Sequence, residues 1–340
     1  MRGSVLILVA WVLCLLAVYA VALSTKARGQ LLVAQRLLQD ADLRRGAEAG
    51  MNRARALLAR PDEAADGEEV LARPWMEREE LFRGIEVGTA TFSLGYDYRD
   101  YTSDDPRFFY GVEDEEGKVN LNTAAQEVLA RLFEATLCIS SSQAQELADA
   151  VVDWRDPDSA AQPKGAEAGF YESLSAPYGC KDAAFESPDE LLLVRGFDAT
   201  IYKNIRGYVT VVGSGRLNIN TAKTPVLLAV GLDVPLSGKI VRYRRGPDAR
   251  WGTLDDGFFA SGADIIEKLT AYAGLTEKEK ADLGGLIAAE AFTFSSSYFS
   301  ATCTAQKDKK EASFSVTAVF QRRLAEEGYD VKPLYWRTFF

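Results

Sequence analysis

The chain begins with a basic residue and a glycine, followed by an unbroken apolar run, MRGSVLILVAWVLCLLAVYAVAL (residues 1–23). The nineteen residues from Val5 to Leu23 include neither a charged side chain nor a proline. Because a helix rises about 1.5 Å per residue, this run nearly spans the roughly 30 Å hydrocarbon core of a bilayer. The sequence therefore predicts that the chain is attached to a membrane, at least when it is made.

Two processing routes fit these residues. A cleaved secretory signal has a basic start, an apolar core and small residues before the cut, and Ala20-Val21-Ala22 matches that pattern. Alternatively, a basic residue, Gly3 and an unbroken apolar helix resemble the signal of type IV pilins and of the pseudopilins of type II secretion. That resemblance implies that prepilin peptidase cuts after Gly3, that Ser4 becomes the methylated N-terminus, and that the helix stays in the lipid. The first 23 residues alone do not decide between the two routes.

The residues after Leu23 favour the retained helix. Apolar side chains recur with the period of a helix between residues 31 and 58, charged residues lie between them, and the first proline is Pro61. We therefore predict one helix over residues 4–60, about 84 Å long, preceded by a leader of residues 1–3. A cleaved signal gives no reason for the pattern to continue in phase. Gly46 and Gly50 lie within this helix, where glycine costs up to about 1 kcal/mol of helix stability.

Composition excludes several classes of protein. A net charge of −10 argues against a nucleic-acid binder, which needs a basic face for the phosphates. The sequence has no histidine, which removes the commonest general base and the commonest zinc ligand. Four cysteines allow, in an oxidising compartment, one disulfide beyond the apolar run and one free thiol. We therefore predict a protein that is not an enzyme.

Two β-rich segments enclose a helical one. Residues 84–98, 107–112, 298–306, 312–323 and 331–340 have strand character, and residues 113–117 form an acidic turn between two of these segments. Residues 119–292 instead contain one helix signal after another. This order predicts an α+β fold in which an antiparallel sheet, built from residues 61–118 and 293–340, is interrupted by an inserted α-helical domain, residues 119–292. Residues 61–74 are predicted to be a loop.

An internal repeat lies inside the helical segment. VNLNTA (residues 119–124) and LNINTA (residues 217–222) are 98 residues apart, and each precedes a predicted helix. The segment after the second copy resembles a helix-hairpin-helix unit, and its basic residues Lys239, Arg242, Arg244 and Arg245 raise the alternative of a membrane-anchored DNA-binding protein. The acidic net charge, and a turn without the usual glycines, argue against DNA. A periplasmic hydrolase with a carboxylate pair is a second alternative, but no histidine or nucleophile motif accompanies the acids.

The motifs taken together, in their order along the chain, resemble the minor pseudopilin K family of bacterial type II secretion. The resemblance covers nearly the whole chain and is carried by the Gly3 signal, GKVNLNTA (117–124), VVDWRDPD (151–158), YESL (171–174), SPDELLLVRGF (187–197) and LNINTA (217–222). It implies a type IV pilin-like α+β fold with a large helical insertion. It also implies a single inner-membrane helix, a periplasmic head and association with the I- and J-type minor pseudopilins. The implied function is a non-catalytic subunit that caps the pseudopilus, helps to initiate it, and so serves protein export across the outer membrane.

One departure from ordinary pilins supports a position at the tip. If Ser4 is the first mature residue, the fifth is Leu8, where most pilins carry a glutamate. A carboxylate is costly inside hydrocarbon, and in the family it is thought to pair with the N-terminal ammonium of a neighbouring subunit. Since Leu8 offers no such partner to a subunit ahead of it, we expect this chain to come first in the fibre.

An acidic stretch and two cysteines complete the candidate sites. Calcium takes six to eight oxygen ligands from flexible loops rich in carboxylates, and calcium binding is also what the family resemblance implies. The predicted ligands are Asp153, Asp156, Asp158, Glu167, Glu172 and Glu186. The alternative is an acidic surface that water satisfies. Cys138 and Cys180 both fall in the helical segment, whereas Cys303 falls on a predicted strand, so we expect a Cys138–Cys180 disulfide.

Overall fold

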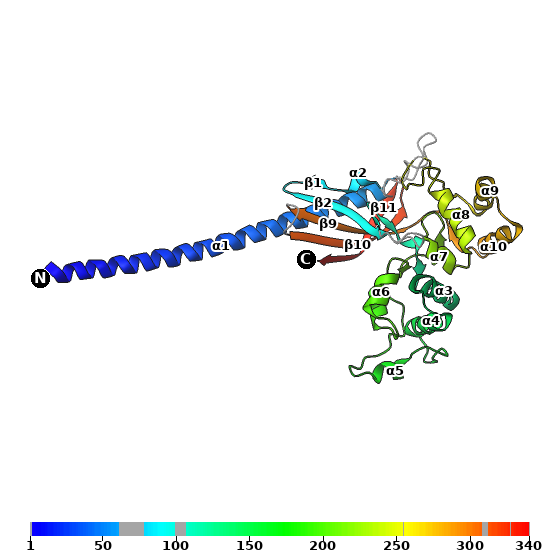
Figure 1. Ribbon diagram of the computed structural model, residues 1–340, viewed down its shortest axis with the longest axis horizontal. Helices are drawn as coiled ribbons and strands as arrows, with labels where there is room; N and C mark the ends of the chain where they lie inside the picture. Colours follow the sequence, from blue (N-terminus) through cyan, green and yellow to red (C-terminus); the bar gives the residue numbers. More distant parts are fainter. Residues whose placement is uncertain are drawn as a thin grey trace.

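The computed structural model describes residues 2–60, 78–98, 107–253, 255–307, 312–326 and 328–339. A long helix leads from the N-terminus into a sheet, and a group of shorter helices lies at the far end of that sheet (Figure 1). The predicted loop at residues 61–74 lies outside the described residues.

Helix α1 (Arg2–Leu58) is continuous, as the periodicity predicted. Residues 7–40 are exposed, and this part is long and apolar enough to cross a membrane by length and composition. The second part lies on the sheet and buries a row of apolar side chains there. That row consists of Leu43, Ala47, Met51, Ala54, Leu57 and Leu58. The same helix therefore has one half that packs within the head and one half that the head leaves bare.

Among the described residues, the sheet has seven antiparallel strands. Its main path is β1-β2-β9-β10-β11, with β3 paired to β2 and β4 paired to β9. The strands are β1 (Ile85–Val87), β2 (Ala90–Tyr98), β3 (Arg107–Phe109), β4 (Glu113–Asp114), β9 (Tyr298–Lys307), β10 (Ala312–Leu324) and β11 (Tyr329–Phe339). The predicted strands near the C-terminus are confirmed. The prediction of one strand over residues 84–98 is wrong, because Gly88, with φ of +62°, turns the chain back into a β1–β2 hairpin.

The residues between β4 and β9 form two units of similar construction, the first over residues 119–210 and the second over residues 217–293. The first contains β5 (Val119–Asn120), α3 (Gln126–Leu137), α4 (Ser141–Arg155), α5 (Ala168–Glu172), the 3₁₀ helix η3 (Pro188–Leu193), α6 (Ala199–Ile205) and β6 (Val209–Thr210). The second contains β7 (Leu217–Asn218), α7 (Thr224–Ala229), α8 (Val234–Arg244), α9 (Gly262–Ala273), α10 (Glu277–Ala288) and β8 (Phe292–Thr293). In each unit the opening strand pairs in parallel with the closing one, β5 with β6 and β7 with β8. The two copies of the repeated motif thus begin equivalent units.

The sheet and helix α1 form one part of the molecule, which we call the pilin-like part. This part and the two units have separate hydrophobic cores. One core lies between α1, the short helix α2 (Glu79–Phe82) and one face of the sheet. The other lies among the helices of the two units, with Leu121, Leu129, Phe133, Ile219 and Leu227 at its centre. The Tyr98 and Trp251 rings meet edge-on between the two parts, with centroids 6.4 Å apart, and polar contacts connect the parts as well.

Two glycines allow α1 to approach the sheet. A β-carbon at Gly46 would lie 3.2 Å from the β-carbon of Ala305, and one at Gly50 would lie 2.3 Å from the sulfur of Cys303 and 2.8 Å from the Phe92 ring. These positions weaken an isolated helix, yet here they provide the close packing on β9. Their presence in a long helix is explained by tertiary packing and not by helix propensity.

We predict that Gly50→Leu destabilises the head by about 3 kcal/mol, since the added side chain would overpack the contact with Cys303 and Phe92. The matched control is Gly29→Leu, because a β-carbon at Gly29 meets nothing within 4 Å. That change should leave stability unchanged or raise it by less than about 1 kcal/mol through helix propensity. Urea unfolding in detergent measures both, and equal effects of the two substitutions would contradict the packing account.

Candidate metal site and buried polar network

The loop after α4 brings together carboxylates from distant positions. One ligand oxygen from each of Asp156, Asp158 and Glu167 lies within 4.8 Å of the others. Glu167 also forms such a group with Cys180 and Asp182. The structure therefore gathers three of the six predicted ligands and adds Asp182, an acidic residue nearby in the sequence that was not among them. We call Asp156, Asp158, Glu167 and Asp182 the loop carboxylates.

Some of the loop carboxylates have buried oxygens without a partner. Within the described residues, one oxygen each of Asp156, Glu167 and Asp182 is buried and accepts no hydrogen bond. Burial, and then the neighbouring carboxylates, raise the pKa of both Asp156 and Glu167. Buried oxygens of this kind are costly unless a donor or a cation satisfies them. The cluster thus has the chemistry of a cation site.

The donor set favours a hard cation. Burial raises the pKa of the Cys180 thiol to about 12, so this residue stays protonated and is a poor metal ligand. The remaining candidates are all carboxylate oxygens, and no histidine occurs in the chain. Oxygen-only sites of irregular geometry suit Ca²⁺ better than zinc or copper. The residues present therefore fit calcium.

The other three predicted ligands do not join the cluster. Asp153 is buried, and its carboxylate accepts a hydrogen bond from the backbone nitrogen of Gln162 at 3.0 Å. It therefore holds the backbone of the loop. Glu172 is exposed at the end of α5. The side chain of Glu186 is 89% exposed, with Lys181 4.0 Å away. The structure thus does not bring Glu172 and Glu186 to the cluster, because spacing along the chain did not reveal which way the loop folds.

The predicted Cys138–Cys180 disulfide is not present in the structure. Both residues are free thiols. Cys138 is exposed where α3 ends, in a left-handed backbone conformation, whereas the sulfur of Cys180 faces the carbonyl of Asp153 at 3.7 Å. The two cysteines belong to the same unit but have different surroundings. Their position in one helical segment of the sequence could not indicate this difference.

Two of the four basic residues that suggested DNA binding are used inside the fold. Lys239 pairs with the Glu279 carboxylate at 2.7 Å. Arg244 is buried, donates to the carbonyls of Ile219 and Ala222, and lies over the Trp251 ring. A DNA-binding hairpin would present these cations to phosphate, so the alternative of a DNA-binding protein is not supported.

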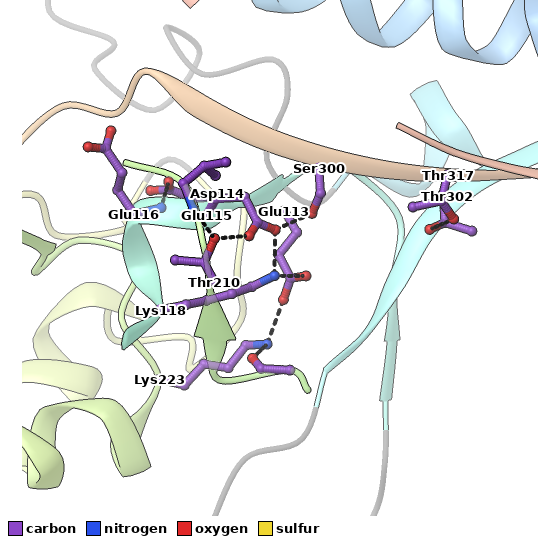
Figure 2. Close-up of polar contacts among 12 residues, drawn as sticks. Glu113, Asp114, Glu115, Glu116, Lys118, Thr210, Lys223, Ser300, Thr302 and Thr317 are labelled. Carbon is purple, nitrogen blue, oxygen red and sulfur yellow. Dashed lines mark hydrogen bonds and ion pairs between the residues drawn. The ribbon is translucent and has the colours of Figure 1, made fainter. Parts of the chain in front are cut away.

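The structure of residues 113–117 differs most from its prediction as an acidic turn. This segment forms strand β4 and the 3₁₀ helix η2 (Glu115–Gly117), and it is buried at the junction between the sheet and the two units. The Glu113 carboxylate lies 2.8 Å from the Lys118 ammonium and 2.7 Å from that of Lys223. Lys118 also lies 2.6 Å from the Glu115 carboxylate, as Figure 2 shows. We call these four groups, with Asp114 and Glu116, the junction network.

The acids of the junction network contact residues that are far apart in the sequence, and Figure 2 shows the contacts of Glu113 and Glu115. Glu115 accepts hydrogen bonds from Thr210 on β6 and Ser300 on β9. The remaining contacts join Asp114 to Asn218, Thr221 and Ser296, and Glu116 to Ser214 and the backbone of Ser297. One short acidic segment thus ties the sheet to both units and to the chain that returns from the second.

The ionisation of the junction network follows from these contacts. Burial alone would raise the pKa of Glu113, but Lys118 and Lys223 outweigh it and lower that pKa. Burial raises the pKa of Asp114 to about 6, although Thr221 and Ser296 donate to it. Burial opposes the charge of Lys118 as well, but Glu113 and Glu115 outweigh it and raise the pKa of Lys118. The sequence signal that could have located the network is a run of four acids followed closely by a lysine and flanked by Val112 and Val119.

We predict that Lys118→Met lowers the free energy of unfolding by about 3–5 kcal/mol, because it leaves the buried Glu115 carboxylate without its cation. Lys332→Met is the matched control. Its ammonium pairs with Asp330 at 3.1 Å but is 65% exposed, so the expected loss is below about 1 kcal/mol. Urea unfolding followed by tryptophan fluorescence compares the two. A Lys118→Met protein as stable as the control would show that the network does not hold the junction.

Known proteins are similar to the segment that contains the acids of this network. A family model described as type II secretion system protein K matches residues 111–214. Proteins of that name are similar over parts of the chain: 39% identical over 101 residues in Aeromonas hydrophila, covering 28% of this chain and 30% of the relative, and 30% identical over 151 residues in Pectobacterium carotovorum subsp. carotovorum, covering 43% and 45%. The matched stretches thus span less than half the length of these two relatives.

A solved structure extends the likeness of the fold to almost the whole chain. A chain in the crystal structure of the GspK-GspI-GspJ complex from the type 2 secretion system of enterotoxigenic Escherichia coli superposes with a TM-score of 0.60 and 17% identity, covering 93% of this chain and 99% of that one. At this identity the likeness concerns the fold, and it confirms the predicted pilin-like α+β architecture. Residues 111–214 of this protein therefore resemble protein K of type II secretion systems, and they lie within a pilin-like α+β fold, as the motifs indicated.

Proposed function

We propose that this protein is a minor pseudopilin of type II secretion, a non-catalytic subunit that caps the pseudopilus and helps to initiate it. The observation that carries the proposal is the division of α1, whose apolar first part is exposed while its second part packs under a head that contains the segment similar to protein K. An exposed apolar helix of this length needs lipid or other helices to cover it. A pilus subunit meets both needs, first in the inner membrane and then in the fibre core.

The position at the tip is supported by shape and by one residue. The two helical units lie at the end of the head far from the N-terminus, beyond the end of the sheet (Figure 1). Leu8 is exposed on α1 and places no carboxylate in the apolar part of the helix. The solved complex of a similar fold includes GspI and GspJ. We therefore propose the corresponding minor pseudopilins as partners, prepilin peptidase as the processing enzyme, and the periplasm as the location of the head.

We predict that the mature protein, purified from bacterial membranes, begins at N-methylated Ser4 and keeps the apolar helix. Intact-mass measurement identifies this terminus directly. Gly3→Val should stay uncleaved, because the residue before the cut would no longer be glycine, and it should no longer co-purify with the I- and J-type subunits in a pseudopilus. A mature terminus at Leu23, as a secretory signal peptidase would leave, would contradict the proposal.

We further propose that the loop carboxylates bind Ca²⁺. The support is geometric: Asp156, Asp158 and Glu167 approach one another closely, Asp182 joins Glu167, and three of these residues have buried oxygens without a partner in the described structure. A divalent cation would satisfy these oxygens and cancel the mutual repulsion that helps to raise the pKa values of Asp156 and Glu167. Its role would be structural, holding a long loop of the first unit in one shape.

We predict that calcium, at 100 times its dissociation constant, stabilises the full-length protein in detergent by about 2.7 kcal/mol relative to chelator. Asp156→Asn combined with Asp182→Asn should abolish most of that difference. Glu186→Gln is the control, since Glu186 is exposed in the same region but outside the cluster, and it should keep the full difference. Thermal unfolding measures all of these, and identical curves in calcium and chelator would leave only an acidic surface that water satisfies.

The same experiment has a pH dependence with a definite sign. The pKa values of Asp156 and Glu167 are raised in the folded state, so at these two sites the metal-free native protein binds more protons than the unfolded chain. Their contribution to stability in chelator should therefore rise as the pH falls from neutral toward the ordinary carboxyl values. Bound calcium holds the carboxylates ionised, so it should remove this rise.

A further inference from the structure

The two units share a backbone clamp made by an asparagine. In the first unit, the side-chain oxygen of Asn122 accepts a hydrogen bond from the nitrogen of Phe185 at 2.7 Å, and its amide donates to the oxygen of Phe185 at 3.0 Å. In the second, Asn220 makes the same two bonds to Phe259, at 2.8 and 2.9 Å. Asn122 and Asn220 occupy the same place in the two copies of the repeated motif, 98 residues apart.

An arginine makes a second contact with each copy of the motif. Arg155, the last residue of α4, donates to the carbonyls of Leu121 and Ala124. Arg244, the last residue of α8, donates to the carbonyls of Ile219 and Ala222. The acceptors are again equivalent positions of the two copies. The motif thus holds an arginine and a phenylalanine backbone close to each other in both units.

In the first unit these two contacts lie at the two ends of the acidic loop. The chain leaves the motif contact at Arg155 and returns to it at Phe185, and all four loop carboxylates fall between those residues. None of the carboxylates bonds to Asn122 or to the Arg155 guanidinium in the described structure. In the second unit the corresponding contacts enclose a shorter segment, between Arg244 and Phe259. Within the described residues, carboxylates cluster in this way in the loop of the first unit, whereas Asp248, Asp255 and Asp256 in the shorter segment accept hydrogen bonds from their own loop.

We infer that Asn122 and Arg155 are positioning residues for the calcium site, an inference that rests on the calcium binding proposed above. They touch no candidate ligand oxygen, but they fix both ends of the loop and so limit how far its like charges can move apart. Without them the loop would have to be ordered at the moment of binding, and that entropic cost would weaken the affinity. Contacts one step removed from the ligands typically change metal affinity by 10- to 100-fold when they are removed.

The test measures the calcium dissociation constant of the full-length protein in detergent by titration calorimetry. Asn122→Ala should raise the dissociation constant about tenfold. Asn220→Ala removes the same two backbone bonds from the second unit and should leave it within about twofold of the unmodified protein. Because both substitutions remove equivalent contacts, a general loss of stability would affect both variants, whereas a positioning role affects only the first.

A second pair of variants covers the case in which Asn122→Ala does not fold. Arg155→Lys keeps the charge but loses the fork that reaches two carbonyls, and it should also weaken calcium binding about tenfold, whereas Arg244→Lys should not. Hydrogen exchange in chelator adds a readout without metal, in which amides of residues 157–184 should exchange faster in Arg155→Lys. If the unmodified protein takes up no calcium, the calcium proposal fails and the inference fails with it. If it binds calcium, but Asn122→Ala and Arg155→Lys keep its dissociation constant, only the positioning inference is overturned.

Discussion

The architecture depends on the pairing of buried charges at the point where the sheet meets the helical units. Glu113 lies between Lys118 and Lys223, and Lys118 is shared with Glu115. The two hydrophobic cores are separate from each other, so they alone cannot set the orientation of one part relative to the other, which also involves the ring contact of Tyr98 with Trp251. Directional contacts can, and removing one partner from a buried ion pair leaves an uncompensated charge. The chain leaves the sheet through this network and, after both units, returns beside it at Ser297 and Ser300.

The junction network and the loop carboxylates show how clustered acidic residues can have two different roles. In the junction network, lysines and hydroxyl groups satisfy the carboxylates, and the result is a rigid joint. In the loop after α4, by contrast, three residues have buried oxygens that no described donor reaches. The first arrangement is complete within the chain. A cation would complete the second, which is the physical basis for proposing calcium there and not at the junction.

Helix α1 has to satisfy two environments with one continuous backbone. Toward the sheet it presents small residues, Gly46 and Gly50, so that the helix can approach β9 closely. Toward its N-terminus it presents large apolar side chains that the head does not cover. A pseudopilin needs this division, since the uncovered part passes from lipid to the core of a fibre while the head stays folded. The glycines therefore allow the packing of the head, whereas the unbroken apolar run has its role in the proposed assembly.

The sequence by itself determined the elements whose signal is local. The continuous α1, the antiparallel strands near the C-terminus, the repeated motif and the likeness to protein K all follow from periodicity or from short motifs, and the structure and the comparisons bear them out. Only the tertiary structure decided which charges meet. Glu113 and Lys223 are 110 residues apart, Asp182 joins the loop carboxylates while Glu172 and Glu186 stay outside, and Cys138 and Cys180 do not bond. Hydrophobic periodicity reports which face of an element is buried, but charge pairing depends on distances that only the packed chain defines.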